Sequence, residues 1–236
     1  MDREYLPLQL LHSLNGPVSN TDFQGLLFLF IKKYSETEPE YEFVPHRFGP
    51  FSYASFRDKW ILMKKGLLEK SGHHWRLTKR GRIQAERSPI RLHALNLFVK
   101  RYGRLRGRRL MIEHYCEYPW DATRMQRLER CRLNTQQLQP VIRARAPRIA
   151  GGLLTFNFGG GKLEAFLNQL LQHSVTLVVD LRKMSDDKPS RSERKTFINA
   201  CRDMDIRYER LADLEYDDFK AGTWPNRTAW LEAYER

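Results

Sequence analysis

The stretch from His46 to Arg82, HRFGPFSYASFRDKWILMKKGLLEKSGHHWRLTKRGR, decides the fold of the first half of the chain. It opens on a Gly-Pro loop, after which Ser52 can cap a helix running from Tyr53 to about Lys65. Gly66 ends this helix where glycine most easily takes a left-handed conformation. Residues of the helix's apolar face recur at helical spacing, and they are Phe56, Trp60 and Met63.

Two short strands and a second helix are predicted after Gly66. Leu67-Leu68 and Trp75–Leu77 flank the turn dipeptide Ser71-Gly72, and Thr78 can cap the last helix. A helix that follows a turn and precedes a small hairpin is the layout of a winged helix-turn-helix. In that layout the helix enters a DNA groove and the hairpin forms the wing.

The quoted stretch also resembles a family of bacterial winged-helix regulators. The resemblance lies in three runs, Phe48-Gly49-Pro50-Phe51-Ser52, Gly66-Leu67-Leu68 and Leu77-Thr78-Lys79-Arg80-Gly81, which match the pattern YGPFS…GLI…LT..G. It implies a winged helix over these residues and the helices before them, with a role in transcription regulation. Because winged helices also dock proteins, a docking module is the alternative.

The composition predicts one or two folded domains. A chain of 236 residues that is 41% apolar can bury a core in each domain. The longest apolar run, Leu26–Ile31, is too short to cross a bilayer, and no secretory signal is visible at the start. Cys116, Cys131 and Cys201 are far apart, which suits a reducing cytoplasm and gives no metal-ligand pattern. We therefore expect a cytoplasmic protein with no metal, no cofactor and no membrane partner.

The positive charge of the chain is confined to one segment. Residues 76–148 carry 19 Lys and Arg against 5 Asp and Glu, whereas the segments on either side are close to neutral. A local excess of this size is the electrostatic footprint of a protein that binds a polyanion. The sequence therefore predicts a nucleic acid as partner, duplex DNA first, bound by a homodimer or as part of a larger complex.

The candidate nucleic-acid contacts are polar or basic residues of the predicted recognition helix, wing, closing helix and basic segment. The histidines of the wing belong with them, because they suit contact with phosphate or solvent better than metal binding. The candidates are Arg47, Ser52, Tyr53, Ser55, Arg57, Lys59, Lys64, His73, His74, Arg76, Lys79, Arg80, Arg82, Arg101, Arg104, Arg106, Arg108 and Arg109.

The periodicity divides the chain into three parts. Residues 1–88 form the predicted winged helix-turn-helix, which begins with helices at Leu6–Leu14 and Phe23–Tyr34. Residues 89–148 form a predicted basic helical connector that ends at a domain boundary near Pro147–Gly152. The connector's expected elements are helices at Ile90–Tyr102, Arg106–Tyr118 and Asp121–Leu138 and a basic linker at Pro140–Pro147.

Residues 149–236 predict a small α/β domain, so the whole chain is of the α+β class. Strands alternate with helices here, which favours a short parallel sheet joined by crossovers. The expected strands are Leu153–Phe158, Val175–Asp180 and Ile206–Leu211, and the expected helices are Lys162–His173 and Ser190 or Ser192 to about Met204.

This α/β segment resembles the family named domain of unknown function 488. The run Thr155–Phe166 matches its TIGYEGRSLEEF pattern, Val178–Arg182 matches LVDVR, and Ile206-Arg207-Tyr208 matches GIxY. Ser185-Asp186-Asp187 departs from the family's P-x-S, and the later C…E…CHR motif has no counterpart. The resemblance therefore implies an incomplete domain for sensing or assembly, and it gives a fold more than a reaction.

Polar residues at the expected strand ends are the candidate catalytic group, since ligands of parallel sheets collect at the carboxyl ends of strands. They are Asn157, Asp180 and Arg182. The structural alternative is an ion pair between Asp180 and Arg182, and no His or Cys lies nearby to complete a nucleophile and base. Two further hypotheses stay open: an enzyme acting on nucleic acid, and a non-catalytic subunit of a phage-defence complex.

Overall fold

The computed structural model describes residues 3–35, 39–87, 92–125, 134–145, 151–156, 162–181 and 191–211. The chain contains both helices and short sheets, which confirms the mixed α and β class. It divides into two compact units, Met1–Ser174 and Val175–Arg236. No described helix combines the length and apolar character needed to span a membrane.

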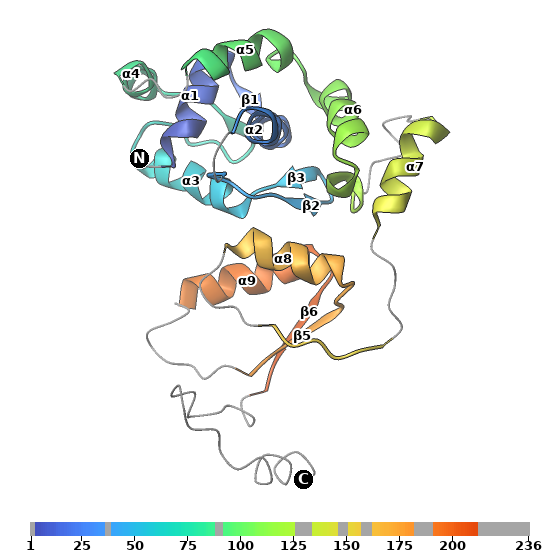
Figure 1. Ribbon diagram of the computed structural model, residues 1–236. Coiled ribbons are helices and arrows are strands. Elements are labelled where there is room, and N and C mark those ends of the chain that lie inside the picture. The colour runs from blue at the N-terminus through green and yellow to red at the C-terminus, as the bar shows by residue number, and fades with distance from the viewer. Residues whose placement is uncertain are drawn as a thin grey trace. The chain divides into compact units, whose positions relative to one another are not determined.

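Most of the described elements belong to the first unit (Figure 1). They are α1 (Tyr5–Leu14), β1 (Val18–Ser19), α2 (Asn20–Tyr34), β2 (Val44–His46), β3 (Gly49–Phe51), α3 (Tyr53–Lys64), β4 (His74–Trp75), α4 (Lys79–Arg87), α5 (Leu92–Tyr102), α6 (Gly107–Glu117), the 3-10 turn η1 (Pro119–Ala122), α7 (Thr135–Ala144) and α8 (Leu163–Gln172).

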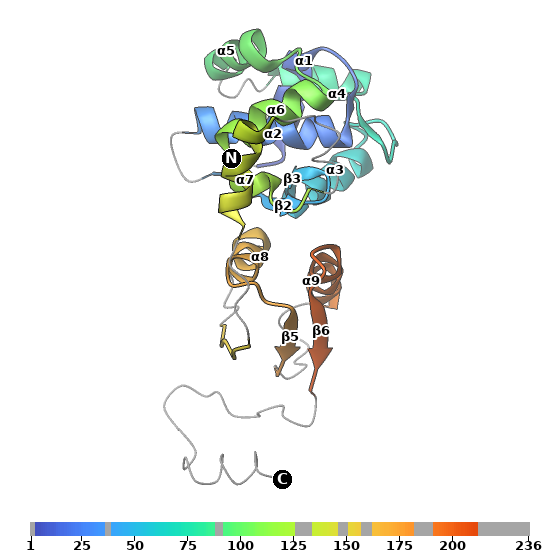
Figure 2. The ribbon, with the colours of Figure 1, turned by 90° about the vertical axis from the view of Figure 1, so that its right-hand side faces the viewer.

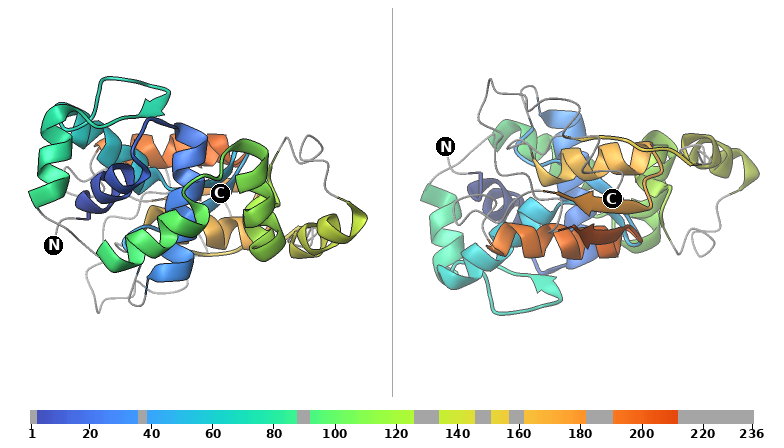
Figure 3. Two further views of the ribbon diagram at one scale, coloured as in Figure 1. Left: turned by 90° about the horizontal axis from the view of Figure 1, so that it is seen from above. Right: turned by 90° about the horizontal axis from the view of Figure 1, so that it is seen from below.

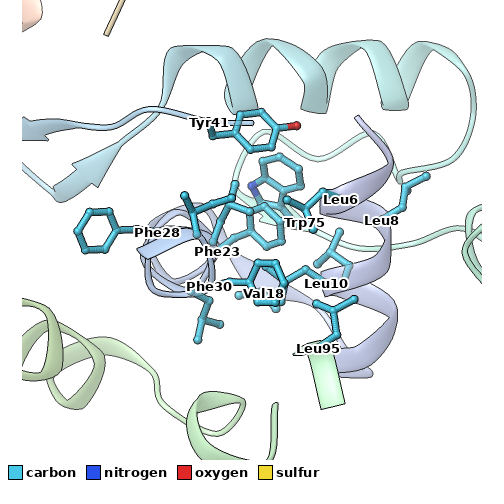
Figure 4. Close-up of a cluster of buried hydrophobic side chains, with 14 of the residues drawn as sticks. Leu6, Leu8, Leu10, Val18, Phe23, Phe28, Phe30, Tyr41, Trp75 and Leu95 are labelled. Atoms are coloured by element: carbon cyan, nitrogen blue, oxygen red, sulfur yellow. The ribbon is translucent and has the colours of Figure 1, made fainter. Parts of the chain in front are cut away.

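Helix α2 is the centre of the first unit. Its residues Phe23–Ile31 are buried without interruption, as expected of a helix that is apolar all round. Figure 2 shows α5 above α2 and α3 below it, and Figure 1 shows the same order. Phe23 stacks on Trp75 with ring centroids 3.9 Å apart, and this pair lies within the cluster drawn in Figure 4. Helix α2, which corresponds to the helix predicted at Phe23–Tyr34, therefore lies within the core.

Local signals placed the ends of α3 and α4 correctly. The Ser52 Oγ accepts a hydrogen bond from the N–H of Ser55 at 3.3 Å, and the Thr78 Oγ1 accepts one from Gly81 at 3.0 Å. Gly66 follows α3 with φ +69°, the left-handed conformation that was predicted. Both caps satisfy N–H groups that a helix leaves free in its first turn.

The predicted hairpin after α3 is shorter than expected. Leu68 and Leu77 form a single antiparallel bridge, extended by the N–H of Glu69 donating to the carbonyl of Arg76. Trp75 instead pairs with Val18 in the antiparallel β1–β4 sheet. The reason is packing, because the buried indole of Trp75 lies on the Phe23 ring at the start of α2.

Two predictions around prolines are wrong. The Gly-Pro loop before α3 is a hairpin, in which β2 and β3 pair with Pro45 opposite Pro50. The helix predicted over Asp121–Leu138 is also absent from its described residues before Asn134, since η1 ends at Ala122. Helix α7 begins only at Thr135, behind a capping box of Asn134 and Gln137, and it includes Pro140 from the predicted linker.

Helix α8 belongs to the first unit, although its sequence was assigned to the α/β domain. The Glu164 Oε1 accepts hydrogen bonds from Ser52 Oγ at 3.1 Å and from the N–H of Ala54 at 2.8 Å. Asn168 donates to the carbonyl of Phe43 at 2.8 Å. These contacts explain why the units divide after Ser174 rather than near residues 147–152. Residues 151–156 form no strand, contrary to the prediction for Leu153–Phe158.

The second unit contains a parallel strand pair. Strand β5 (Leu177–Asp180) and β6 (Arg207–Arg210) pair in register with Leu177 opposite Arg207, and α9 (Arg191–Asp203) connects them. This confirms the predicted parallel pairing of two of the expected strands. The core of the unit includes side chains from α9 and the turn after it, namely Phe197, Ala200, Cys201, Met204 and Ile206.

Close packing between α2 and α6 predicts a cost for Gly25→Ala. A Cβ at Gly25 would lie 2.4 Å from Cε1 of the buried His114, whose Nε2 bonds the Gly25 carbonyl at 2.9 Å. Alanine favours a helix over glycine by only about 1 kcal/mol, so the clash should dominate. We expect a net loss of about 1–3 kcal/mol in urea unfolding. Gly16→Ala is the matched control, because nothing lies within 4 Å of its Cβ.

Burial of His114 predicts a pH dependence of stability. Burial lowers the pKa of His114 to about 4 from the ordinary 6.5, so the unfolded chain binds more protons between these values. Stability should therefore fall as the pH drops through this window. The contribution of Asp121 to stability changes in the opposite direction with pH over much of the same range, because burial raises the pKa of Asp121 to about 7.

The variant His114→Gln separates the two effects. Its amide can still donate to the Gly25 carbonyl, and it cannot take up a proton in this range. The stability advantage of the parent protein over the variant should shrink by about 2–3 kcal/mol between pH 7.5 and pH 4.5. An advantage that stays constant would contradict a buried neutral imidazole.

Candidate nucleic-acid interface

Burial removes three candidates from the surface of α3. Ser52, Ser55 and Lys59 are each at most 1% exposed. Ser52 is the helix cap, and the Ser55 Oγ accepts a hydrogen bond from Gln24 of α2 at 2.9 Å. The prediction that these residues contact nucleic acid is therefore wrong for the folded first unit. They face inward because α3 packs on α2 along this side.

Lys59 is a lysine of the core. Its Nζ donates to Asn20 Oδ1 at 2.7 Å and lies 5.4 Å from the centroid of the Trp75 ring. Burial lowers the pKa of Lys59 to about 8, since a low-dielectric surrounding disfavours the ammonium. Its role is to join α3 to the start of α2.

The remaining candidates of the wing, α3, α4 and the basic segment are largely exposed. Tyr53 and Arg106 are half-buried, and Arg76 pairs with Glu69 at 3.5 Å. Lys79, Arg80 and Arg82 lie on α4, which Figures 1 and 3 show separated from α6 by α1 and α2. The exposed candidates are Arg47, Arg57, Lys64, His73, His74, Arg76, Lys79, Arg80, Arg82, Arg101, Arg104, Arg108 and Arg109.

Arg106 organises the turn between α5 and α6. Its Nη1 donates to the carbonyls of Gly103 at 2.8 Å and Leu105 at 2.6 Å. This corrects the prediction that Arg106 reaches nucleic acid, since the guanidinium is used inside its own turn. With the turn held in this way, Arg104 within it and Arg108 and Arg109 in the first turn of α6 are exposed.

Two turns are anchored on the first turn of α2. The N–H of Gly107, at the start of α6, donates to Asp22 Oδ1 at 2.7 Å. The N–H of Asn20 donates to the His73 carbonyl at 2.9 Å, and its Nδ2 donates to the Gly72 carbonyl at 2.6 Å. The two anchoring residues, Asn20 and Asp22, are two residues apart, so the hairpin turn and the turn before α6 are held at the same end of α2.

We call the exposed basic side chains of these two turns the basic rim. Arg104 and Arg109 form no hydrogen bond or ion pair with any other described residue, so both cations can meet an external anion. The acid beneath them, Asp22, is engaged by Gly107 and by the hydroxyl of Ser19. The basic rim consists of His73, His74, Arg104, Arg108 and Arg109.

Asn20 and Asp22 are the site residues that sequence reasoning missed. The run Ser19–Asp22 precedes the predicted helix and offers several helix caps, of which Ser19 accepts from the N–H of Asp22. The additional signal was the number of polar side chains, because a cap requires one and this run offers four. The surplus side chains hold the neighbouring turns.

In the second unit, Asp180 has structural partners. Its Oδ2 accepts a hydrogen bond from the Tyr208 hydroxyl at 2.7 Å and lies 3.9 Å from Nη2 of Arg194. The side chain is buried, so the carboxylate is held between β6 and α9. Asn157, Arg182 and the glycines 159–161 lie outside the described residues. The described residues also include no group of three His, Cys, Asp or Glu side chains suited to a metal ion.

The geometry of these residues is the basis for a functional assignment. No family model, curated protein or solved structure matches the chain. Among the candidate residues, the structure brings together those of the basic rim.

The two lysines of α3 offer a matched test of the interface. Lys59→Met should leave duplex affinity within about two-fold, because Lys59 is buried and cannot reach a phosphate. Lys64→Met removes an exposed charge from the same helix and is the comparison. Fluorescence anisotropy with a labelled duplex measures both. A large loss for Lys59→Met in a protein of unchanged melting temperature would contradict the inward position of this lysine.

Proposed function

We propose that this chain binds nucleic acid, with the basic rim holding the phosphate backbone of duplex DNA. The observation that carries the proposal is the anchoring of two basic turns on Asn20 and Asp22. His74 and Arg104, which are thirty residues apart in the sequence, can then contact the same binding partner. Phosphate contacts of this kind position a protein on DNA without reading its sequence.

The proposed fold of residues 3–87 is a winged helix-turn-helix with an inserted hairpin. The order α1, β1, α2, α3 and then the Leu68–Leu77 hairpin supports it. So does the pairing of β1 with β4, which closes a small sheet beside the helices. The insertion is the β2–β3 hairpin between α2 and α3. The wing of this fold is then the hairpin turn of the basic rim.

The charge distribution favours a polyanionic partner for this surface. The segment that supplies the rim arginines carries a net charge of +14, counted as 19 basic minus 5 acidic residues over 76–148. Such a field attracts DNA and raises the rate of association. An acidic protein would also be attracted to this surface. The salt dependence of the affinity for duplex DNA distinguishes contact with many backbone phosphates from docking of such a protein.

We further propose that the protein acts as a regulator or as a targeting subunit. The second unit, whose described residues include a parallel strand pair, would then serve assembly or ligand sensing. The buried engagement of Asp180 with Tyr208 and Arg194 favours this structural role over a catalytic one.

The rim predicts a specific change in salt dependence. Each phosphate contact contributes about −0.9 to the slope of log K against log salt, because binding releases condensed counterions. The double variant Arg104→Ala with Arg109→Ala should therefore make the slope shallower by about 1–2. The loss should be similar for duplexes of different sequence. Anisotropy titrations over a salt series measure both quantities.

The matched control removes the same number of charges from α7. Arg143→Ala with Arg145→Ala takes two exposed arginines from the end of α7 and its C-cap, on a helix that packs on η1. Its slope should stay within about 0.5 of the parent value, since these side chains are outside the rim. Equal changes in the two double variants would indicate a general charge effect and overturn the rim as the binding surface.

A further inference from the structure

An exposed run of aromatic rings lies on the hairpin β2–β3 and on α3. Phe48 is 45% exposed and Trp60 is 48% exposed, although Trp60 belongs to the predicted apolar face of its helix. Phe51 and Phe56 lie between them and are half-buried. We call these four residues, Phe48, Phe51, Phe56 and Trp60, the aromatic strip.

The rings of the strip are in contact with one another. The centroids of Phe56 and Trp60 are 6.5 Å apart, and those of Phe51 and Phe56 are 5.7 Å apart. The buried His46 connects Phe51, at 5.1 Å, to Phe48, at 5.5 Å. Pairing of β2 with β3 and the Ser52 cap hold the two halves of the strip in place. Phe51, Phe56 and Trp60 therefore form a run of neighbouring rings on a supported backbone, and the buried His46 links this run to the exposed Phe48.

Positive charge accompanies the aromatic strip. The guanidinium of Arg47 lies 5.2 Å from the Phe48 ring centroid, and Arg57 and Lys64 are exposed on α3. The one acid of α3, Asp58, is buried and accepts two hydrogen bonds from Arg3. The exposed side of α3 thus combines aromatic and basic side chains without an acid.

We propose that the aromatic strip binds an unpaired nucleic-acid strand, whose bases stack on the exposed rings while the phosphates contact Arg47, Arg57 and Lys64. This inference deepens the proposed function and depends on it, since it makes a junction of duplex and single strand the preferred ligand. Stacking tolerates any base, because every base has a π face.

The composition of α3 favours stacking over reading a duplex groove. Groove readout uses hydrogen-bonding side chains such as Arg, Asn and Gln at base edges. Among the candidate contacts on α3 and its cap, Ser52, Ser55 and Lys59 are buried and Tyr53 is half-buried, which leaves Arg57 and Lys64. The exposed area is supplied instead by Trp60, with Phe56 beside it. Flat rings of this kind match base faces rather than base edges.

The test compares labelled single strands with a labelled duplex. Oligodeoxyuridylate and oligouridylate of about ten nucleotides suit an aromatic surface of this type and differ only in the 2′-hydroxyl. Phe48→Ala and Trp60→Ala should each lower single-strand affinity about ten-fold and leave duplex affinity within about two-fold. Trp60→Phe should recover most of the loss, since it keeps a ring. Ile83→Ala, an equally exposed apolar residue on α4, is the control and should change neither affinity.

Each outcome decides between the two proposals. Unchanged single-strand affinity in the alanine variants, with duplex binding intact, would overturn the stacking site and leave the basic rim standing. An equal loss on duplex and single strand would also overturn it, because it would place α3 in a duplex groove. If the parent protein binds neither probe, the proposed nucleic-acid function itself fails. A difference between the two single strands identifies DNA or RNA as the preferred source.

Discussion

Asn20 joins three parts of the first unit that are distant in the sequence. Its N–H and Nδ2 donate to the hairpin turn, and its Oδ1 accepts from the buried ammonium of Lys59 on α3. A buried ammonium costs several kcal/mol unless a partner compensates it. Asn20 therefore cannot be lost without leaving Lys59 unpaired in the core. The position of the hairpin and the position of α3 depend on the same side chain.

The same helix end gives the proposed binding surface its rigidity. Asp22 holds the start of α6 while Asn20 holds the hairpin, so both turns are fixed before any partner arrives. Long arginine side chains still lose rotamer freedom on binding, but the backbone that carries them does not have to be ordered. A surface of this kind can bind phosphates with little reorganisation.

Local sequence signals predicted the helices, while long-range contacts decided the site. Ser52, Gly66 and Thr78 act on their own turns, so their roles followed from neighbouring residues. The burial of Lys59 did not, because its partner lies on another helix and lysine is seldom buried. Trp75 likewise pairs with Val18, far earlier in the chain, and no local pattern indicates that choice. The basic rim likewise depends on long-range contacts. Its charges were evident in the sequence, but the residues that anchor its two turns were not.

The start of α3 gives a last reason to separate the roles of helix and rim. A helix N-terminus attracts anions, and in many proteins it binds a phosphate. Here Glu164 of α8 already accepts from Ser52 Oγ and from the N–H of Ala54, and it is only 3% exposed. An external phosphate cannot use these donors while α8 is docked. Phosphates of a bound strand must therefore meet side-chain cations, which the rim and the flanks of the aromatic strip supply.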